Sequence, residues 1–234
     1  MRKRFLPRLV TVVVALVAAC LTGSLTAAAE APVRPLMGGM ALNADPTGPV
    51  SRPCVSAFNV RSGKTGYVLT HGACGRVGQP VYGPDGTLIG KIAFVGTVGP
   101  DAALVEVSNT RQWEQGPWIA LPETRQPLTV AGAKEAPVGG KVCISSPVSG
   151  SRCGTITARN QTVNLPDRTL RGMIRTDICV RDGDRGAPLF ARDVLGRVHA
   201  QGHLVAASRW FPCASYFQPL DAVLSHYRLT LLTG

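Results

Sequence analysis

Residues 54–74 read CVSAFNVRSGKTGYVLTHGAC, a stretch in which two cysteines enclose two short apolar segments. The segments 57–61 and 67–70 carry residues that favour strands, and SGKTG at 62–66 is a turn signal between them. This stretch therefore predicts a β-hairpin. The same criteria predict two further hairpins, at residues 155–159 with 162–165 around Asn160-Gln161, and at residues 189–192 with 198–201.

Glycine and proline punctuate the whole chain, with 26 glycines and 18 prolines among 234 residues. This excess disfavours a helical bundle, and a hydrophobic content of 45% is too high for a disordered chain. The composition therefore predicts an all-β fold built from many short strands. One helix is predicted after Pro219. Its apolar residues follow helical spacing: Leu220, Val223, Leu224 and Tyr227.

The first thirty residues have the features of an export signal. A basic start precedes an apolar stretch at 9–21, and small residues at 27–29 suit a signal peptidase, so residues 1–29 are predicted to be a signal peptide of a secreted protein. The alternative is a lipobox at residues 17–20, in which Cys20 becomes lipidated and anchors the protein to a membrane. Residues 30–50, rich in proline, glycine and alanine, are predicted to form a loose N-terminal arm.

The formal net charge of the chain is +11, but four basic residues belong to the predicted signal peptide. The remaining positive charge suits an anionic cell-wall polymer or a membrane surface. No run of four basic residues follows residue 8, so a soluble basic surface is the favoured explanation of the charge, and no nucleic-acid partner is expected.

Six cysteines remain when Cys20 is set aside. They are Cys54, Cys74, Cys143, Cys153, Cys179 and Cys213. An even number in an exported chain predicts three disulfides, and their spacing leaves the pairing open. No C-x2-C pair is present and the histidines do not fall at ligand spacings, so no metal or other cofactor is expected.

Five motifs in a fixed order resemble the streptogrisin type of bacterial chymotrypsin-like serine proteases (the S1 family). They are the stretch at 54–74, DAALV at 101–105, the cysteine pair at 142–154, MIRTDICVRDGDRGAPLF at 173–190, and YFQP at 216–219. The resemblance implies a peptidase domain over residues 51–234, made of two packed six-stranded β-barrels with the active site between them. It also pairs Cys54 with Cys74, Cys143 with Cys153, and Cys179 with Cys213.

Two of the three catalytic positions implied by the resemblance hold residues that cannot act as a base or a nucleophile. The family places its base in T-A-G-H-C, where this chain has THGAC at 70–74, so Ala73 takes the base position. The family places its nucleophile in G-D-S-G-G-P, where this chain has GDRGAP at 183–188, so Arg185 takes that position. Asp101 is retained as the carboxylate that orients the base.

No nearby side chain is expected to replace what is missing. Between Asp177 and Ala207 there is no serine or threonine, and Cys179 is expected in a disulfide. His71 lies two residues before the base position, and a partly buried structural role is expected for it, because such a shift moves a side chain by several ångströms. A catalytic role for His71 is the alternative.

The substrate groove is also predicted to differ from the family's. Val205, Ala206 and Ala207 stand where the resemblance implies S-G-G, and their side chains narrow the pocket. The aromatic residues at 210–211 either pack in the core or present a patch to a partner. The backbone N–H groups of Gly183 and Arg185 are expected to keep the arrangement of an oxyanion hole.

A buried Asp101 without its imidazole is an unpaired charge, so a cation is expected beside it. The hypothesis is that Arg185 reaches across the space left by Ala73 and pairs with Asp101; the alternative is an exposed Arg185 on a relaxed loop. A buried Asp184 likewise needs a cationic or N–H partner.

The sequence as a whole predicts a secreted, monomeric protease homologue that no longer cleaves peptides and binds a protein, a peptide or an anionic cell-wall polymer. The alternative is a working serine endopeptidase, which the fold alone suggests. A different hydrolase that reuses Asp101 and His71 is the remaining hypothesis, with neither a nucleophile nor a metal set in its favour.

Overall fold

The computed structural model describes residues 32–44, 54–96, 98–208 and 212–234. The predicted signal peptide, Cys20, Trp210 and Phe211 lie outside the described residues. Within those ranges, no helix has the length and apolar character needed to span a membrane.

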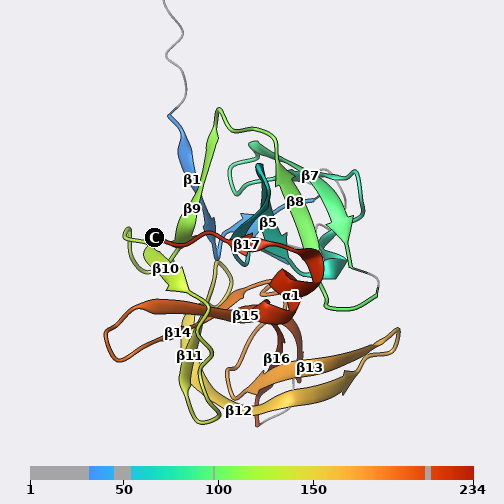
Figure 1. Ribbon diagram of the computed structural model, residues 1–234, viewed down its shortest axis with the longest axis vertical. Helices are drawn as coiled ribbons and strands as arrows, with labels where there is room; N and C mark the ends of the chain where they lie inside the picture. The colour runs from blue at the N-terminus through green and yellow to red at the C-terminus, as the bar shows by residue number, and fades with distance from the viewer. Residues whose placement is uncertain (1–31, 45–53, 97, 209–211) are drawn as a thin grey trace, which may run out of the picture. The chain divides into compact units, whose positions relative to one another are not determined.

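A six-stranded antiparallel sheet holds most of the first half of the chain, in the order β17-β4-β5-β8-β7-β6 (Figure 1). Its strands are β4 (Asn59–Ser62), β5 (Thr65–Thr70), β6 (Pro80–Tyr82), β7 (Leu88–Val95), β8 (Ala103–Val107) and β17 (Thr230–Leu231). The first predicted hairpin is confirmed as β4 and β5, with Gly63 at a φ of 57° in the turn. Because β17 comes from the C-terminus, the end of the chain ties back onto this first sheet.

A second sheet closes on itself. β15 pairs with β14 on one side and with β16 on the other, so the order β15-β14-β11-β12-β13-β16 forms a six-stranded barrel (Figure 1). Its strands are β11 (Lys141–Ser146), β12 (Gly150–Asn164), β13 (Thr169–Thr176), β14 (Pro188–Arg192), β15 (Val198–Ser208) and β16 (Ala214–Pro219). The predicted hairpin of residues 189–192 with 198–201 is confirmed as β14 and β15.

The second sheet continues beyond the barrel. β10 (Leu128–Gly132) pairs with β15, and β9 (Trp113–Ile119) pairs with β10. A shared apolar cluster fills the space where the sheets meet, with Val60 and Leu69 from the first and Phe190 and Ala200 from the second. The two six-stranded units agree with the expected two-barrel fold.

The predicted hairpin at residues 155–165 is wrong. Residues 155–164 belong to one continuous strand, β12, which pairs with β13 instead of folding back at Asn160-Gln161. Asn160 has a φ of 56° and the register shifts between Ala158 and Gln161, so the left-handed residue forms a bulge within the strand. As a result, the true hairpin tip lies at residues 165–168, much farther along the chain.

The predicted N-terminal arm is not loose where the structure describes it. β1 (Arg34–Gly38) pairs in parallel with β9, and β2 (Ala41–Leu42) pairs with β3 (Cys54–Val55). Leu36 is fully buried, and this apolar anchor outweighs the proline and glycine content of the segment.

The predicted C-terminal helix is confirmed as α1 (Leu220–Tyr227), which buries Leu220 and Val223. It begins directly after Pro219, as a fixed φ at the helix start favours, and ends at Arg228 in the left-handed conformation. The Tyr227 hydroxyl donates a hydrogen bond to the carbonyl of Pro100 at 2.6 Å. The helix therefore fixes the backbone next to Asp101.

Three disulfides join the pairs that the resemblance implies: Cys54–Cys74, Cys143–Cys153 and Cys179–Cys213. The first lies beside the short 3-10 helix η1 (Gly72–Cys74), which contains Ala73. Such bonds persist in oxidising compartments, so they fit an extracellular protein.

Candidate functional site

A pocket of about 650 Å³ opens between the two sheets. Five parts of the described chain line it: residues 71–73 at η1, the tip of the β12–β13 hairpin, the loop before β14, the end of β15, and Cys213 just before β16. The lining side chains include Ala73, Arg168, Arg185, Val205, Ala206 and Ala207. The structure thus brings most of the predicted site residues together around one cavity, and the bulkier wall at 205–207 leaves it open.

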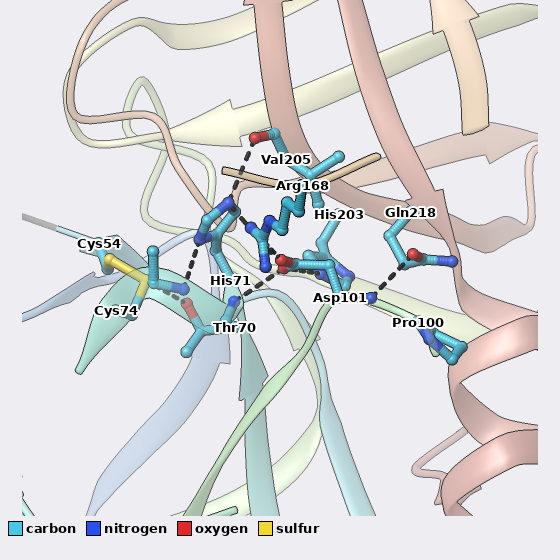
Figure 2. Close-up of polar contacts among 12 residues, drawn as sticks. Cys54, Thr70, His71, Cys74, Pro100, Asp101, Arg168, His203, Val205 and Gln218 are labelled. Carbon is cyan, nitrogen blue, oxygen red and sulfur yellow. Dashed lines mark hydrogen bonds and ion pairs between the residues drawn. A yellow bond between two sulfur atoms is a disulfide. The ribbon is translucent and has the colours of Figure 1, made fainter. Parts of the chain in front are cut away.

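Asp101 lies behind this pocket with its side chain fully buried. The Gly72 N–H donates a hydrogen bond to its Oδ1 at 2.8 Å, and its own N–H donates to Oε1 of Gln218 at 2.9 Å (Figure 2). A Cβ at Gly72 would lie 3.1 Å from Oδ2 of Asp101, so the absence of a side chain there permits the close approach.

The cation beside Asp101 is Arg168, and the predicted pairing with Arg185 is wrong. Arg168 extends from the β12–β13 tip and places Nη2 2.6 Å from Oδ2 of Asp101 (Figure 2). Arg185 is exposed at the mouth of the pocket, as the alternative hypothesis held. The need for a cation was visible in the sequence, but its source was not, because the false hairpin at Asn160-Gln161 misplaced the tip that carries Arg168.

The loop that carries Arg185 is held by its backbone. The Val55 N–H donates to the Arg185 carbonyl at 2.7 Å, and the Gly186 N–H donates to the Leu204 carbonyl at 3.0 Å. Gly186 has a φ of 86°, and a Cβ there would come within 2.3 Å of the Val55 carbonyl oxygen. A glycine is therefore required directly after Arg185.

Asp184 obtains an N–H partner, as predicted, together with two hydroxyl donors. The Arg181 N–H donates to Oδ2 at 2.6 Å, while the Ser146 and Ser149 hydroxyls donate to the two carboxylate oxygens at 2.5 Å. These donors compensate the burial of the charge without a neighbouring cation. Gly183 has a φ of 99°, a backbone conformation that L side chains rarely adopt.

His71 lies beneath the pocket with only 3% of its surface exposed. Its Nδ1 accepts a hydrogen bond from the Ala73 N–H at 2.8 Å, and its Nε2 lies 3.2 Å from the Val205 carbonyl oxygen (Figure 2). A carbonyl only accepts, so Nε2 carries the proton and Nδ1 does not. Both ring nitrogens are therefore engaged with the backbone.

Burial lowers the pKa of His71 to about 4, and the charges of His203, Arg185 and Arg168 act in the same direction. Asp101 opposes this shift, with Oδ1 3.9 Å from Nε2 of His71. The imidazole is therefore neutral at pH 7. The pKa of Asp101 itself is affected first by burial, which raises it, but His203, His71 and the Gly72 N–H together hold it below its ordinary range.

His203 was missed by sequence reasoning. It lies on β15 with no exposed surface, and its Nε2 is 3.8 Å from Oδ1 of Asp101 (Figure 2). Neither ring nitrogen has a hydrogen-bond partner among the described residues. Its position on a strand that reads as an ordinary apolar segment carries no signal that the side chain faces Asp101.

Metal binding finds no support around this cluster. Across the described ranges, no group of three or more histidine, cysteine, aspartate and glutamate side chains is arranged to hold a metal ion. The guanidinium of Arg168 already occupies the open side of Asp101.

The comparisons with known proteins point to one group of bacterial enzymes. No protein-family model matches the chain. It is 32% identical over 181 residues to streptogrisin-C of Streptomyces griseus, covering 77% of this chain and 38% of that protein. It is 34% identical over 143 residues to serine protease 2 of Streptomyces fradiae, covering 59% of this chain and 80% of that protein. The chain thus spans well under half the length of the first relative and most of the second.

Solved structures agree with this result. Thermobifida fusca protease A has 30% identity and a TM-score of 0.72, covering 86% of this chain and 100% of that chain. Cellulomonas bogoriensis chymotrypsin has 32% identity and a TM-score of 0.71, with the same coverage.

Proposed function

The chain belongs to the streptogrisin type of S1 chymotrypsin-like serine proteases, and from this membership we propose that it is a homologue that does not hydrolyse peptides and uses its pocket for binding. The observation that carries the proposal is the ion pair between Arg168 and Asp101. In a working triad the buried carboxylate orients an imidazole. Here the guanidinium of Arg168 pairs with that carboxylate, and Ala73 supplies no imidazole.

The nucleophile position supports the same conclusion. Arg185 has no group that can attack a carbonyl at neutral pH, because its guanidinium stays protonated. Ser208 is the one hydroxyl side chain among the described residues that line the pocket. Strand rise separates it from Val205 by about 10 Å. His71 contacts the carbonyl of Val205, so it lies too far away to activate Ser208.

His71 is a poor substitute for the missing base. Its Nδ1 lone pair accepts the Ala73 N–H, and its Nε2 already carries a proton. Taking a further proton would break the bond to Ala73 and charge a buried ring whose pKa is lowered to about 4. The same contacts weigh against a different hydrolase built on His71 and Asp101.

Export is part of the proposal. The disulfides fit an oxidising compartment, and the basic and apolar features of residues 1–29 fit a cleaved signal peptide. Neither the fold nor the relatives support lipidation of Cys20. A protein, a peptide or an anionic cell-wall polymer remains the class of partner proposed for the secreted chain.

The competing function is a working serine endopeptidase, and the similarity to serine protease 2 of Streptomyces fradiae favours it. The two functions are separated by incubating the purified protein with a serine-directed phosphonate probe and with a denatured protein substrate. We expect no labelled serine and no cleavage. A labelled serine, identified by mass spectrometry, would overturn the proposal.

A gain-of-function variant tests the reason for inactivity. Replacing Ala73→His and Arg185→Ser restores the two lost groups, but Arg168 would still hold Asp101. We therefore expect probe labelling of the triple variant that also carries Arg168→Ala, and weaker labelling of the double variant. Equal labelling of both would show that Arg168 does not matter for the chemistry.

A further inference from the structure

We infer that the pocket binds the free C-terminal carboxylate of a peptide, with the guanidinium of Arg185 as its anchor. This inference rests on the proposed function, since it names a ligand for a pocket that does not cleave. It adds a role for a residue whose presence the loss of catalysis alone does not explain.

The side chain of Arg185 is placed to hold an anion. Its side chain lines the pocket and is exposed, and it makes no hydrogen bond or ion pair with any described residue. Arg168, by contrast, is neutralised by Asp101 at 2.6 Å. A guanidinium offers five donors in a planar fork that suits a carboxylate. Among the described residues, nothing occupies the donors of the Arg185 side chain.

The backbone next to the Arg185 side chain offers further hydrogen-bond donors. No hydrogen bond within the described residues uses the N–H of Gly183 or of Arg185. The N–H of Asp184 between them donates to the Arg181 carbonyl at 3.2 Å. Neighbouring free N–H groups in a turn with a positive φ form a concavity that attracts anions. An anion held by Arg185 would thus find further donors nearby.

The short side chain of Ala73 leaves room for a ligand in the pocket. Ala73 is exposed and lines the pocket, and its side chain is a single methyl group. The space beyond this methyl group adjoins the exposed side chain of Arg185, which lines the same pocket. Asp167 and Asp182 also line the pocket, but both are exposed to solvent, where their charges are screened.

One wall of the pocket is apolar. This wall favours the C-terminus of a peptide over an acidic side chain as the source of the bound carboxylate. Val180, Ala206 and Ala207 line the pocket beside the charged mouth, and the almost fully buried Leu204 and Val205 lie behind them. A peptide that ends in an apolar residue places its last side chain on this wall and its carboxylate at Arg185. An acidic side chain would instead put polar atoms against the apolar surface.

The test compares three peptides on the purified protein by calorimetry. They are acetyl-Ala-Ala-Ala-Leu with a free carboxylate, the same peptide as a C-terminal amide, and acetyl-Ala-Ala-Ala-Glu as an amide. We expect the free acid to bind at least about tenfold more tightly than either amide, as loss of a charge-assisted hydrogen bond implies. Equal binding of acid and amide, tighter binding of the glutamate amide, or no binding of the acid at millimolar concentration would each overturn the inference.

Two variants assign the effect to its residue. Arg185→Gln keeps a polar side chain and removes the charge, and we expect it to lose most of the preference for the acid. Arg192→Gln is the matched control, because Arg192 is an exposed arginine that does not line the pocket. Full preference in Arg185→Gln would overturn the assignment to Arg185.

The failure of this inference can be told apart from the failure of the proposed function. Each peptide is recovered after the titration, and its molecular mass is measured by mass spectrometry. Cleaved peptide would overturn the absence of hydrolysis whatever the affinities are. Intact peptide that binds without regard to its terminus would overturn only the carboxylate site.

Discussion

Arg168 Nη2 lies 2.6 Å from Oδ2 of Asp101, so an arginine at the tip of the β12–β13 hairpin neutralises a carboxylate at the start of β8 (Figure 2). This ion pair joins the two six-stranded units across the pocket. The buried carboxylate of Asp101 therefore has a cation beside it that comes from a distant part of the chain.

Arg168→Ala is expected to lower the free energy of unfolding by about 3 kcal/mol at pH 7. The change leaves a fully buried carboxylate without its cation, while the 31% exposure of Arg168 keeps the cost at the lower end of the range for buried pairs. Chemical denaturation gives the value. Arg171→Ala, on an exposed arginine of β13, should change stability by less than about 0.5 kcal/mol. Equal effects of the two variants would show that the ion pair is not stabilising.

Stability is expected to fall as the pH drops from about 6.5 towards 4. The pKa of His71 is lowered from 6.5 to about 4 in the folded state, so within this window the unfolded chain binds more protons. The slope for one such group approaches about 1.4 kcal/mol per pH unit. The carboxylate of Asp101 stays charged here because its pKa is held below its ordinary range, and its contribution is lost only at lower pH.

Denaturation curves measured across this window test the assignment to His71. His71→Asn should flatten the pH dependence, whereas His226→Asn, at an exposed position on α1, should leave it unchanged. A slope that persists in His71→Asn would assign the titration to another group.

Gly186→Ala is expected to destabilise the protein by about 2 kcal/mol or more. The new Cβ would lie within 2.3 Å of the Val55 carbonyl oxygen, at a φ of 86°. Gly196 is the matched control, with a φ of 77° and no atom within 4 Å of the place a Cβ would take, so Gly196→Ala should cost only about 1 kcal/mol. Thermal unfolding of both variants measures the difference, and similar losses would contradict the close contact with Val55.

Ser146→Ala is expected to cost about 2 kcal/mol, because it removes a hydroxyl donor at 2.5 Å from the buried carboxylate of Asp184. Ser151→Ala is its control, since Ser151 donates to Glu123 at an exposed position and should cost less than about 1 kcal/mol. Equal losses in denaturant titrations would mean that Asp184 does not depend on Ser146.

Local sequence signals predicted those elements whose determinants lie close together in the chain. The β4–β5 and β14–β15 hairpins and helix α1 all follow from turn residues and apolar spacing within a few positions. The signal at Asn160-Gln161 failed for a physical reason. A residue with positive φ suits either a tight turn or a bulge, and the long pairing of β12 with β13 selected the bulge.

The sequence by itself determined the order of the motifs along the chain, the even set of cysteines, and the presence of alanine at position 73 and arginine at position 185, since these depend only on which residues follow one another. Only the tertiary structure decided that Arg168 neutralises Asp101, that His203 faces it from β15, and that His71 is held by the backbone on both nitrogens. These contacts join segments far apart in the chain. Which side chains meet depends on where the tip of the β12–β13 hairpin and the face of β15 lie once both sheets have packed. No local pattern in the sequence encodes those positions.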